Sequence, residues 1–126
     1  MFNFKISTLA AAVVLGLTAL AVAPLASAKD GDVRVRGACT QRSTAKLKLS
    51  RENRGIEVEF EVDQNRNGVP WRVTLRRNGA LVASATARTR GPSGSFEFRR
   101  VVSGSGTIVA VATRASGERC TARAAI

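Results

Sequence analysis

Four acidic side chains in one short segment are the first residues of this chain that could do chemistry. Glu57, Glu59, Glu61 and Asp63 alternate with apolar residues, so in an extended segment all four carboxylates lie on one face. Two carboxylates at such a spacing are the pair that glycoside hydrolysis requires. The segments expected beside this one carry Lys and Arg, which keep carboxylates ionised and leave no proton donor. We therefore expect a salt-bridged surface rather than a catalytic pair.

Other catalytic arrangements lack a necessary residue. The chain contains no His, which excludes Ser-His-Asp and Cys-His nucleophiles as well as histidine metal sites. Two Ser-Gly stretches, at residues 91–95 and 103–106, do not lie between a strand and a helix, where a nucleophilic serine of the G-x-S-x-G type sits. We expect no enzymatic activity, no catalytic residue and no cofactor.

Residues 63–68 (DQNRNG) match the first half of a calcium-binding loop. The second half does not match, because Thr74 stands at the twelfth position, where a bidentate Glu is needed. Arg66 also places a positive charge beside the ion, and Asn and Gly are common turn formers. We expect a turn and no metal site; any calcium binding here would be of millimolar affinity.

The N-terminal 28 residues have the pattern of a secretory signal peptide. Lys5 precedes an apolar run over residues 6–25, and Ala26 and Ala28 form a small-residue cleavage site. The alternative is an uncleaved anchor, since the apolar run approaches membrane-spanning length. We expect cleavage after Ala28, which leaves a secreted mature chain of residues 29–126, extracellular or associated with the cell wall, without stable membrane insertion.

The chain has two cysteines, Cys39 and Cys120. Outside the cytosol a single such pair most often forms a disulfide. Neither cysteine belongs to a C-x-x-C motif, and the chain has no histidine that could act as a base. Both facts argue against a reactive thiol. We expect a structural disulfide that links the two ends of the mature chain.

The elements that position these residues are predicted to be strands. Apolar and polar residues alternate with a period of two through the mature chain, and clusters of Gly, Asn, Ser and Pro separate the runs. The runs cover residues 33–39, 45–49, 56–62, 71–75, 81–87, 96–102, 107–113 and the surroundings of residue 120. This pattern predicts an all-β fold, a single antiparallel β-sandwich of about seven or eight strands, with a small closed β-barrel as the alternative.

Charge matching predicts how the first strands pair. If Ser50 lies opposite Gly55, apolar residues meet on one face and Lys meets Glu on the other. If Val62 then lies opposite Trp71, the acidic strand has basic strands on both sides. We expect both pairings.

The turn after the Trp71 strand allows two registers. A three-residue loop over residues 77–79 places Leu75 opposite Leu81. This register buries Leu81, Ala83 and Ala85 opposite the large Trp71, and we favour it over a two-residue loop for that reason.

Two resemblances rest on these segments. The Trp71 strand, followed by Asn78-Gly79 and a strand of small residues, resembles the immunoglobulin and fibronectin type III class, which implies an immunoglobulin-like sandwich over residues 29–126. The chain lacks the Tyr of the tyrosine corner, and its cysteines would join the first and last strands, unlike those of antibody domains. Residues 46–50, 56–65 and 92–97 resemble small secreted proteins of high-GC Gram-positive bacteria that have no assigned role. Neither resemblance supplies functional residues.

An excess of basic residues is the one positive indication of function. The chain has 20 Lys and Arg against 9 Asp and Glu, a formal net charge of +11, and such a protein attracts polyanions. The candidate contacts are Arg88, Arg90, Arg99 and Arg100, which we expect on one sheet. The aromatic residues of the mature chain, Phe60, Trp71, Phe96 and Phe98, fall on apolar faces. We therefore predict no specific nucleic-acid partner, which would need exposed rings for stacking.

These observations favour a non-catalytic binding module for an extracellular polyanion or a cell-wall polymer. The alternative is a protein–protein interaction module, an inhibitor or adhesin, whose basic charge is incidental.

Overall fold

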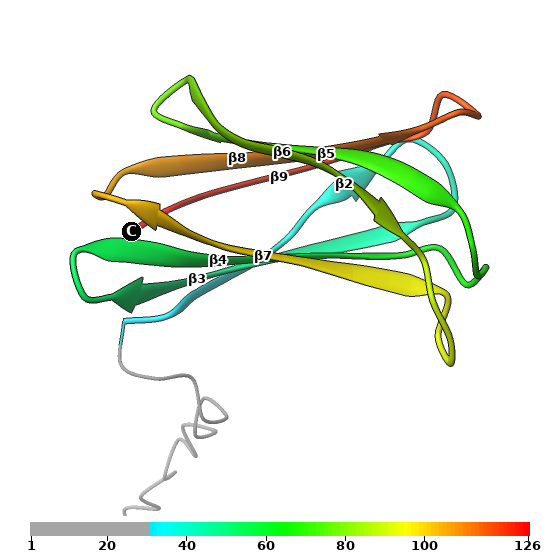
Figure 1. Ribbon diagram of the computed structural model, residues 1–126, viewed down its shortest axis with the longest axis horizontal. Helices are drawn as coiled ribbons and strands as arrows, with labels where there is room; N and C mark the ends of the chain where they lie inside the picture. Colours follow the sequence, from blue (N-terminus) through cyan, green and yellow to red (C-terminus); the bar gives the residue numbers. More distant parts are fainter. Residues whose placement is uncertain (1–30) are drawn as a thin grey trace, which may run out of the picture.

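A computed structural model describes residues 31–126, and within this part of the chain all regular structure is β (Figure 1). The strands are β1 (Val33–Arg36), β2 (Ala38–Cys39), β3 (Thr44–Glu52), β4 (Gly55–Asp63), β5 (Pro70–Arg77), β6 (Ala80–Arg88), β7 (Ser95–Ser103), β8 (Thr107–Arg114) and β9 (Arg119–Ala125). The expected signal peptide, with Ala26 and Ala28, lies outside the described residues. No helix of the described part is long and apolar enough to cross a membrane.

Two antiparallel sheets pack face to face, which confirms the predicted sandwich. One sheet has four strands in the order β1-β3-β4-β7, and the other has five in the order β2-β9-β8-β5-β6 (Figure 1). The sheets do not close into a barrel, so each keeps two edges. The chain crosses between the layers five times, from β1 to β2, β2 to β3, β4 to β5, β6 to β7 and β7 to β8.

The first predicted strand is in fact two strands, because the chain changes sheets at Gly37. β1 pairs with β3 in the four-stranded sheet, whereas β2 pairs with β9 in the five-stranded sheet. A Cβ atom at Gly37 would lie 2.8 Å from the carbonyl oxygen of Thr121 and 2.9 Å from the Cβ of Ala45. Only glycine fits between the two layers at this point.

The inward-facing residues of both sheets form one continuous core. Trp71 and Phe60 are its largest fully buried side chains. The ring of Phe96 packs between them, with its centroid 6.1 Å from that of Trp71 and 6.5 Å from that of Phe60. Trp71 belongs to one layer and the two phenylalanines to the other, so these rings hold the sheets together.

The β3–β4 hairpin has a shorter loop than predicted. Gly55 lies opposite Glu52, not Ser50, because Asn53 adopts a left-handed conformation with φ of 51° that permits a two-residue connection. The shift is two residues, so every side chain keeps its predicted face.

The predicted neighbour of the acidic strand β4 is wrong. β4 pairs with β3 on one side and with β7 on the other, and β5 lies in the opposite sheet. The apolar faces explain the difference: Phe60 lies opposite Phe98 and Val62 opposite Phe96, so β7 extends the inner face of β4 while Trp71 covers it from the other layer.

The register after β5 is also wrong. Asn78 and Gly79 form a two-residue turn with φ of 48° and 86°. A bulge lies just before this turn in the chain, at Leu75/Arg76. Leu81 therefore lies opposite Arg76 and is 52% exposed, while Ala87 lies opposite Trp71. A two-residue hairpin turn is favoured where both residues can adopt positive φ, as Asn and Gly do. The bulge then shifts the register by one residue, so Ala83, Ala85 and Ala87 of β6 face inward.

Candidate polyanion interface

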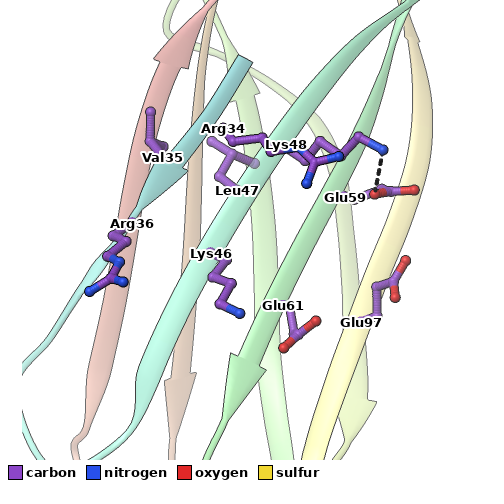
Figure 2. Close-up of a pocket in the computed structure, with 9 residues that line it drawn as sticks. All are labelled: Arg34, Val35, Arg36, Lys46, Leu47, Lys48, Glu59, Glu61 and Glu97. Carbon is purple, nitrogen blue, oxygen red and sulfur yellow. Dashed lines mark ion pairs between the residues drawn. The ribbon is translucent and has the colours of Figure 1, made fainter. Parts of the chain in front are cut away.

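The outer surfaces of the two sheets differ in their charge. The outer surface of the four-stranded sheet carries both basic and acidic side chains, and we call this surface the mixed face. Figure 2 shows its centre, where the basic residues of β1 and β3 adjoin the glutamates of β4 and β7. Five of its basic residues are Arg34, Arg36, Lys46, Lys48 and Arg99. Five of its acidic residues are Asp32, Glu57, Glu59, Glu61 and Glu97.

Ion pairs join two basic residues of the mixed face, Lys48 and Arg99, to its acids. Lys48 Nζ lies 3.6 Å from a Glu59 oxygen, and Arg99 Nη2 lies 2.7 Å from an oxygen of Glu59 and of Glu97. The hydrogen bond to Glu97 and the charge of Glu59 raise the pKa of Arg99. The expected salt bridges are present for Glu57 and Glu59, with Lys48 and Arg99 as partners in place of any residue of β5. Glu61 and Asp63 make no ion pair within residues 31–126.

The outer surface of the five-stranded sheet carries positive charge without acidic neighbours. The strands β2, β5, β6, β8 and β9 contain no Asp or Glu. The exposed basic residues of this surface, which we call the arginine face, are Arg72, Arg76, Arg88, Arg119 and Arg123.

The register of three strands places four of these arginines at the corners of a rectangle. Arg72 lies opposite Thr113 of β8, which lies opposite Arg119 of β9. Arg76 and Arg123 stand in the same relation four residues further along. From the usual strand geometry, the backbone sites are about 10 Å apart across the sheet and about 13 Å apart along it. Exposed arginine side chains extend from all four corners.

A shallow depression of about 240 Å³ lies within this rectangle. Two half-buried threonines, Thr74 and Thr113, contribute to its lining. Its lining residues are Arg72, Thr74, Arg76, Val111, Thr113 and Arg119. Guanidinium and hydroxyl groups are hydrogen-bond donors to phosphate and sulfate oxygens.

The guanidinium groups of the arginine face have no carboxylate partner among residues 31–126. Arg76 donates to the carbonyl oxygen of Gly79 at 3.3 Å, and Arg88 donates to that of Gly68 at 3.1 Å. Both bonds leave donors of the guanidinium group free. The face is thus a positive surface that its own protein does not neutralise.

The four arginines singled out from the sequence do not share one sheet, so that expectation is wrong. Arg88 lies on the arginine face, at the end of β6. Arg90 lies in the following loop, where it pairs with Ser95. Arg99 belongs to the ion pairs of the mixed face, and Arg100 lies over the ring of Phe98 at 4.3 Å, on the edge of the four-stranded sheet.

Sequence reasoning missed Arg72, Arg76, Arg119 and Arg123. The predicted pairing of Val62 with Trp71 would place the first two beside the acidic strand, and the actual pairing of β4 with β7 rules this out. Counting the charges of each predicted strand could have found them. The segments 70–77 and 119–125 contain no acid, and each has two arginines four residues apart, which lie on one face of a strand.

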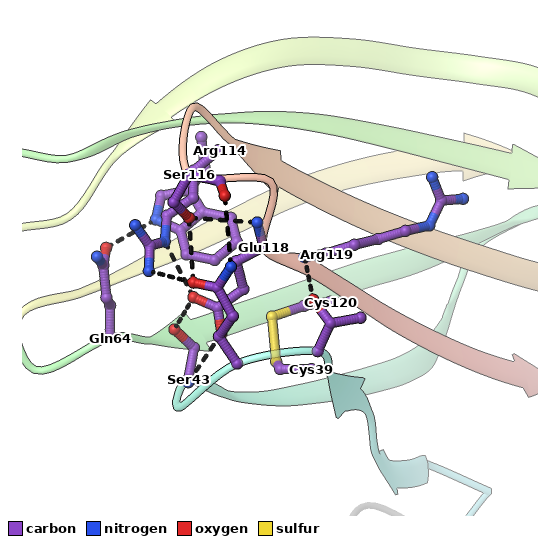
Figure 3. The surroundings of a disulfide bond; sticks show 11 residues. Cys39, Ser43, Gln64, Arg114, Ser116, Glu118, Arg119 and Cys120 are labelled. Carbon is purple, nitrogen blue, oxygen red and sulfur yellow. Dashed lines mark hydrogen bonds and ion pairs between the residues drawn. A yellow bond between two sulfur atoms is a disulfide. The ribbon is translucent and has the colours of Figure 1, made fainter.

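Cys39 and Cys120 form the predicted disulfide (Figure 3). They are direct partners on β2 and β9, with their Cα atoms 4.0 Å apart, and so lie within one sheet. The bond ties the short β2 to the sheet that carries Arg119 and Arg123.

A buried polar network lies beside this disulfide (Figure 3). Glu118, which is 0% exposed, accepts hydrogen bonds from the amide and the hydroxyl of Ser43 at 3.0 and 2.8 Å and from Arg114 Nε at 2.9 Å. Burial by itself raises the pKa of Glu118, but the bonds from Ser43 and Arg114 outweigh it, so the pKa is lowered. Arg114 also lies 5.6 Å from the centre of the Trp71 ring, whose Nε1 donates to Gln64.

This network holds the turn between β8 and β9 against the loop before β3. The strand that follows the turn, β9, carries Arg119 and Arg123, so the network helps to position these two arginines.

The loop over residues 63–68 has the geometry of a turn. The carboxylate of Asp63 accepts a hydrogen bond from the amide of Asn65 at 3.0 Å, and Asn65 and Gly68 have positive φ. These are the roles that Asp, Asn and Gly play in turns.

In comparisons with known proteins, no family model matches this chain, and no curated protein is significantly similar to it in sequence. The fold and the charge distribution define its class: a disulfide-containing β-sandwich with one outer surface that carries both signs of charge and one that carries arginines without acids.

Proposed function

We propose that this protein is a secreted, non-catalytic binding module that holds an extracellular polyanion on its arginine face. The observation that supports this most directly is the separation of charge between the two sheets. Exposed cations with no carboxylate beside them are free to contact the repeated phosphate or sulfate groups of a polymer. The mixed face carries as many acidic as basic residues in the set given above, and two of its cations, Lys48 and Arg99, are held in ion pairs.

The ligand class follows from the side chains of the face. The exposed part of the arginine face contains no Trp, Tyr or Phe among the described residues, so bases have no ring to stack on. Arginine forks and threonine hydroxyls instead suit the oxygens of a charged backbone. We therefore propose an anionic polymer such as a cell-wall polymer, recognised through its charged groups.

Secretion belongs to this proposal. The signal-peptide pattern of residues 1–28 and the disulfide support an oxidising, extracytoplasmic location.

Two variants of equal net charge test the proposal. Arg72→Ser/Arg119→Ser removes two corners of the arginine face, whereas Lys48→Ser/Arg99→Ser removes two cations that the mixed face holds in ion pairs. Binding to heparin and to isolated cell wall is measured across a salt series. We expect the slope of log affinity against log salt to fall by about one per lost contact in the first variant, and to change by much less in the second. Equal effects of the two variants would show that the charge acts without a defined face.

A further inference from the structure

The two sheets leave four edge strands, and three of them are protected against pairing with another chain. β1 is four residues long and carries Arg34 and Arg36, and β2 is two residues long. β7 carries Glu97, Arg99 and Arg100. β6 is nine residues long and has no charge before Arg88, its last residue. An uncharged edge of this length is an open template for strand pairing.

The backbone of β6 presents free hydrogen-bonding groups along that edge. At its end, the amide of Thr89 donates to Val69 at 3.0 Å and its carbonyl accepts from Gly68 at 2.7 Å, toward the β5 side. In a strand, the N–H and C=O groups of successive residues point alternately to the two sides. Because those of Thr89 point toward β5, the amides and carbonyls of Ser84 and Thr86 face away from β5.

A groove of about 420 Å³ runs beside this edge, where β6 and β7 face each other across the open side of the sandwich. Its walls are the small residues 82–84 of β6 and residues 100–103 of β7, with Arg77 at one end. Val101 of this groove is 62% exposed, and the guanidinium of Arg100 has no carboxylate partner among residues 31–126. No acidic residue lines the groove.

We propose that β6 is a docking edge for an extended peptide with acidic side chains, which adds as a sixth strand to the five-stranded sheet. Backbone bonds to Ser84 and Thr86 would supply affinity, and alternate side chains of the peptide would enter the groove. Two cations, Arg77 and Arg100, and no acid face that position, so the charge favours acidic side chains there. A second copy of this chain fits less well, since it would bring further arginines against the same cations.

Ser84→Pro is the decisive variant, because proline removes an outward-facing amide without removing a β5–β6 bond. Ser84→Thr is its matched control, since threonine keeps the amide and suits a strand. The probe is a blocked nine-residue peptide of alternating Val and Glu, with a Val–Gln peptide for comparison, and binding is measured by calorimetry. We expect the Val–Glu peptide to bind the wild-type chain and Ser84→Thr alike, and Ser84→Pro about tenfold more weakly.

Hydrogen exchange distinguishes strand pairing from simple charge attraction, because only pairing protects the backbone amides. The Val–Glu peptide is expected to slow exchange of the Ser84 and Thr86 amides. Heparin binding is expected to be the same for Ser84→Pro and Ser84→Thr, which separates this edge from the arginine face. The proposal is overturned if the Val–Gln peptide binds equally well, if Ser84→Pro retains full affinity, or if those amides are protected by dimer formation without peptide.

Discussion

Replacing the buried Glu118 by glutamine tests how much of the stability of this sandwich depends on one polar network. The carboxylate accepts three hydrogen bonds, two from Ser43 and one from Arg114, and is 0% exposed. Glu118→Gln keeps the shape of the side chain, but its NH2 group must face one of these donors. A buried donor then loses its acceptor, which costs about 1–3 kcal/mol.

The charge adds to this cost. The Arg114 side chain is 20% exposed, so solvent compensates only in part for the lost carboxylate, and breaking a buried ion pair from one side costs about 3–5 kcal/mol. For this partly exposed pair we expect a total loss of about 3 kcal/mol at pH 7. In a domain of this size that corresponds to a melting temperature lower by about 15 °C.

The effect should depend on pH with a defined sign. The pKa of Glu118 is lower in the folded state than in the unfolded state, where it is about 4.3. The ionised carboxylate therefore contributes its full stabilisation above about pH 5, and this contribution is lost as the pH falls through the native pKa. The difference in stability between wild type and variant is expected to shrink in acid.

Urea unfolding followed by the fluorescence of the single, buried Trp71 measures this difference, with the disulfide intact in both proteins. Glu52→Gln, a change of the same kind without an ion pair among the described residues, is expected to stay within about 0.5 kcal/mol of wild type. A loss below about 1 kcal/mol for Glu118→Gln, or an equal loss at pH 7 and pH 3, would refute the reasoning.

Three further predictions concern other parts of the chain. Replacing Cys39 and Cys120 by serine opens a loop with a sequence separation of 81 and is expected to cost about 4 kcal/mol in chemical denaturation; a cost below about 1 kcal/mol would contradict it. Gly37→Ala places a Cβ atom 2.8 Å from the carbonyl oxygen of Thr121, so we expect a lower melting temperature by calorimetry, and an unchanged value would show that the crossing between sheets adjusts freely. Mass spectrometry of the exported protein is expected to find Lys29 as the first residue, and a retained N-terminus would favour the uncleaved anchor.

Local sequence patterns predicted the elements of this fold well. The alternation of apolar and polar residues identified the strands and their inner faces, because a strand buried on one side needs an apolar residue at every second position. The faces of Leu47, Leu49 and Val58 were correct even though the register of their hairpin was not, since a shift of two residues preserves the face. Gly37 was read as part of one strand, because nothing local distinguishes a residue that changes sheets.

Local patterns did not predict which strands pair when they lie far apart in the sequence. Charge matching placed the Trp71 strand beside the acidic strand, whereas β7 lies there and its Arg99 pairs with Glu59. Each exposed ion pair contributes less than about 1 kcal/mol. Packing of the Trp71 ring on Phe96 from the opposite layer buries far more apolar surface, and burial decides the order of strands.

The sequence by itself determined that this chain forms an antiparallel sandwich with a disulfide and an excess of positive charge, because periodicity, cysteine count and charge are properties of local residues. Only the tertiary structure decided where that charge lies. Core packing sent β5 and β9 to one sheet and the acidic β4 to the other. Arg72 and Arg119, far apart in the chain, thereby came to share a face that contains no acid.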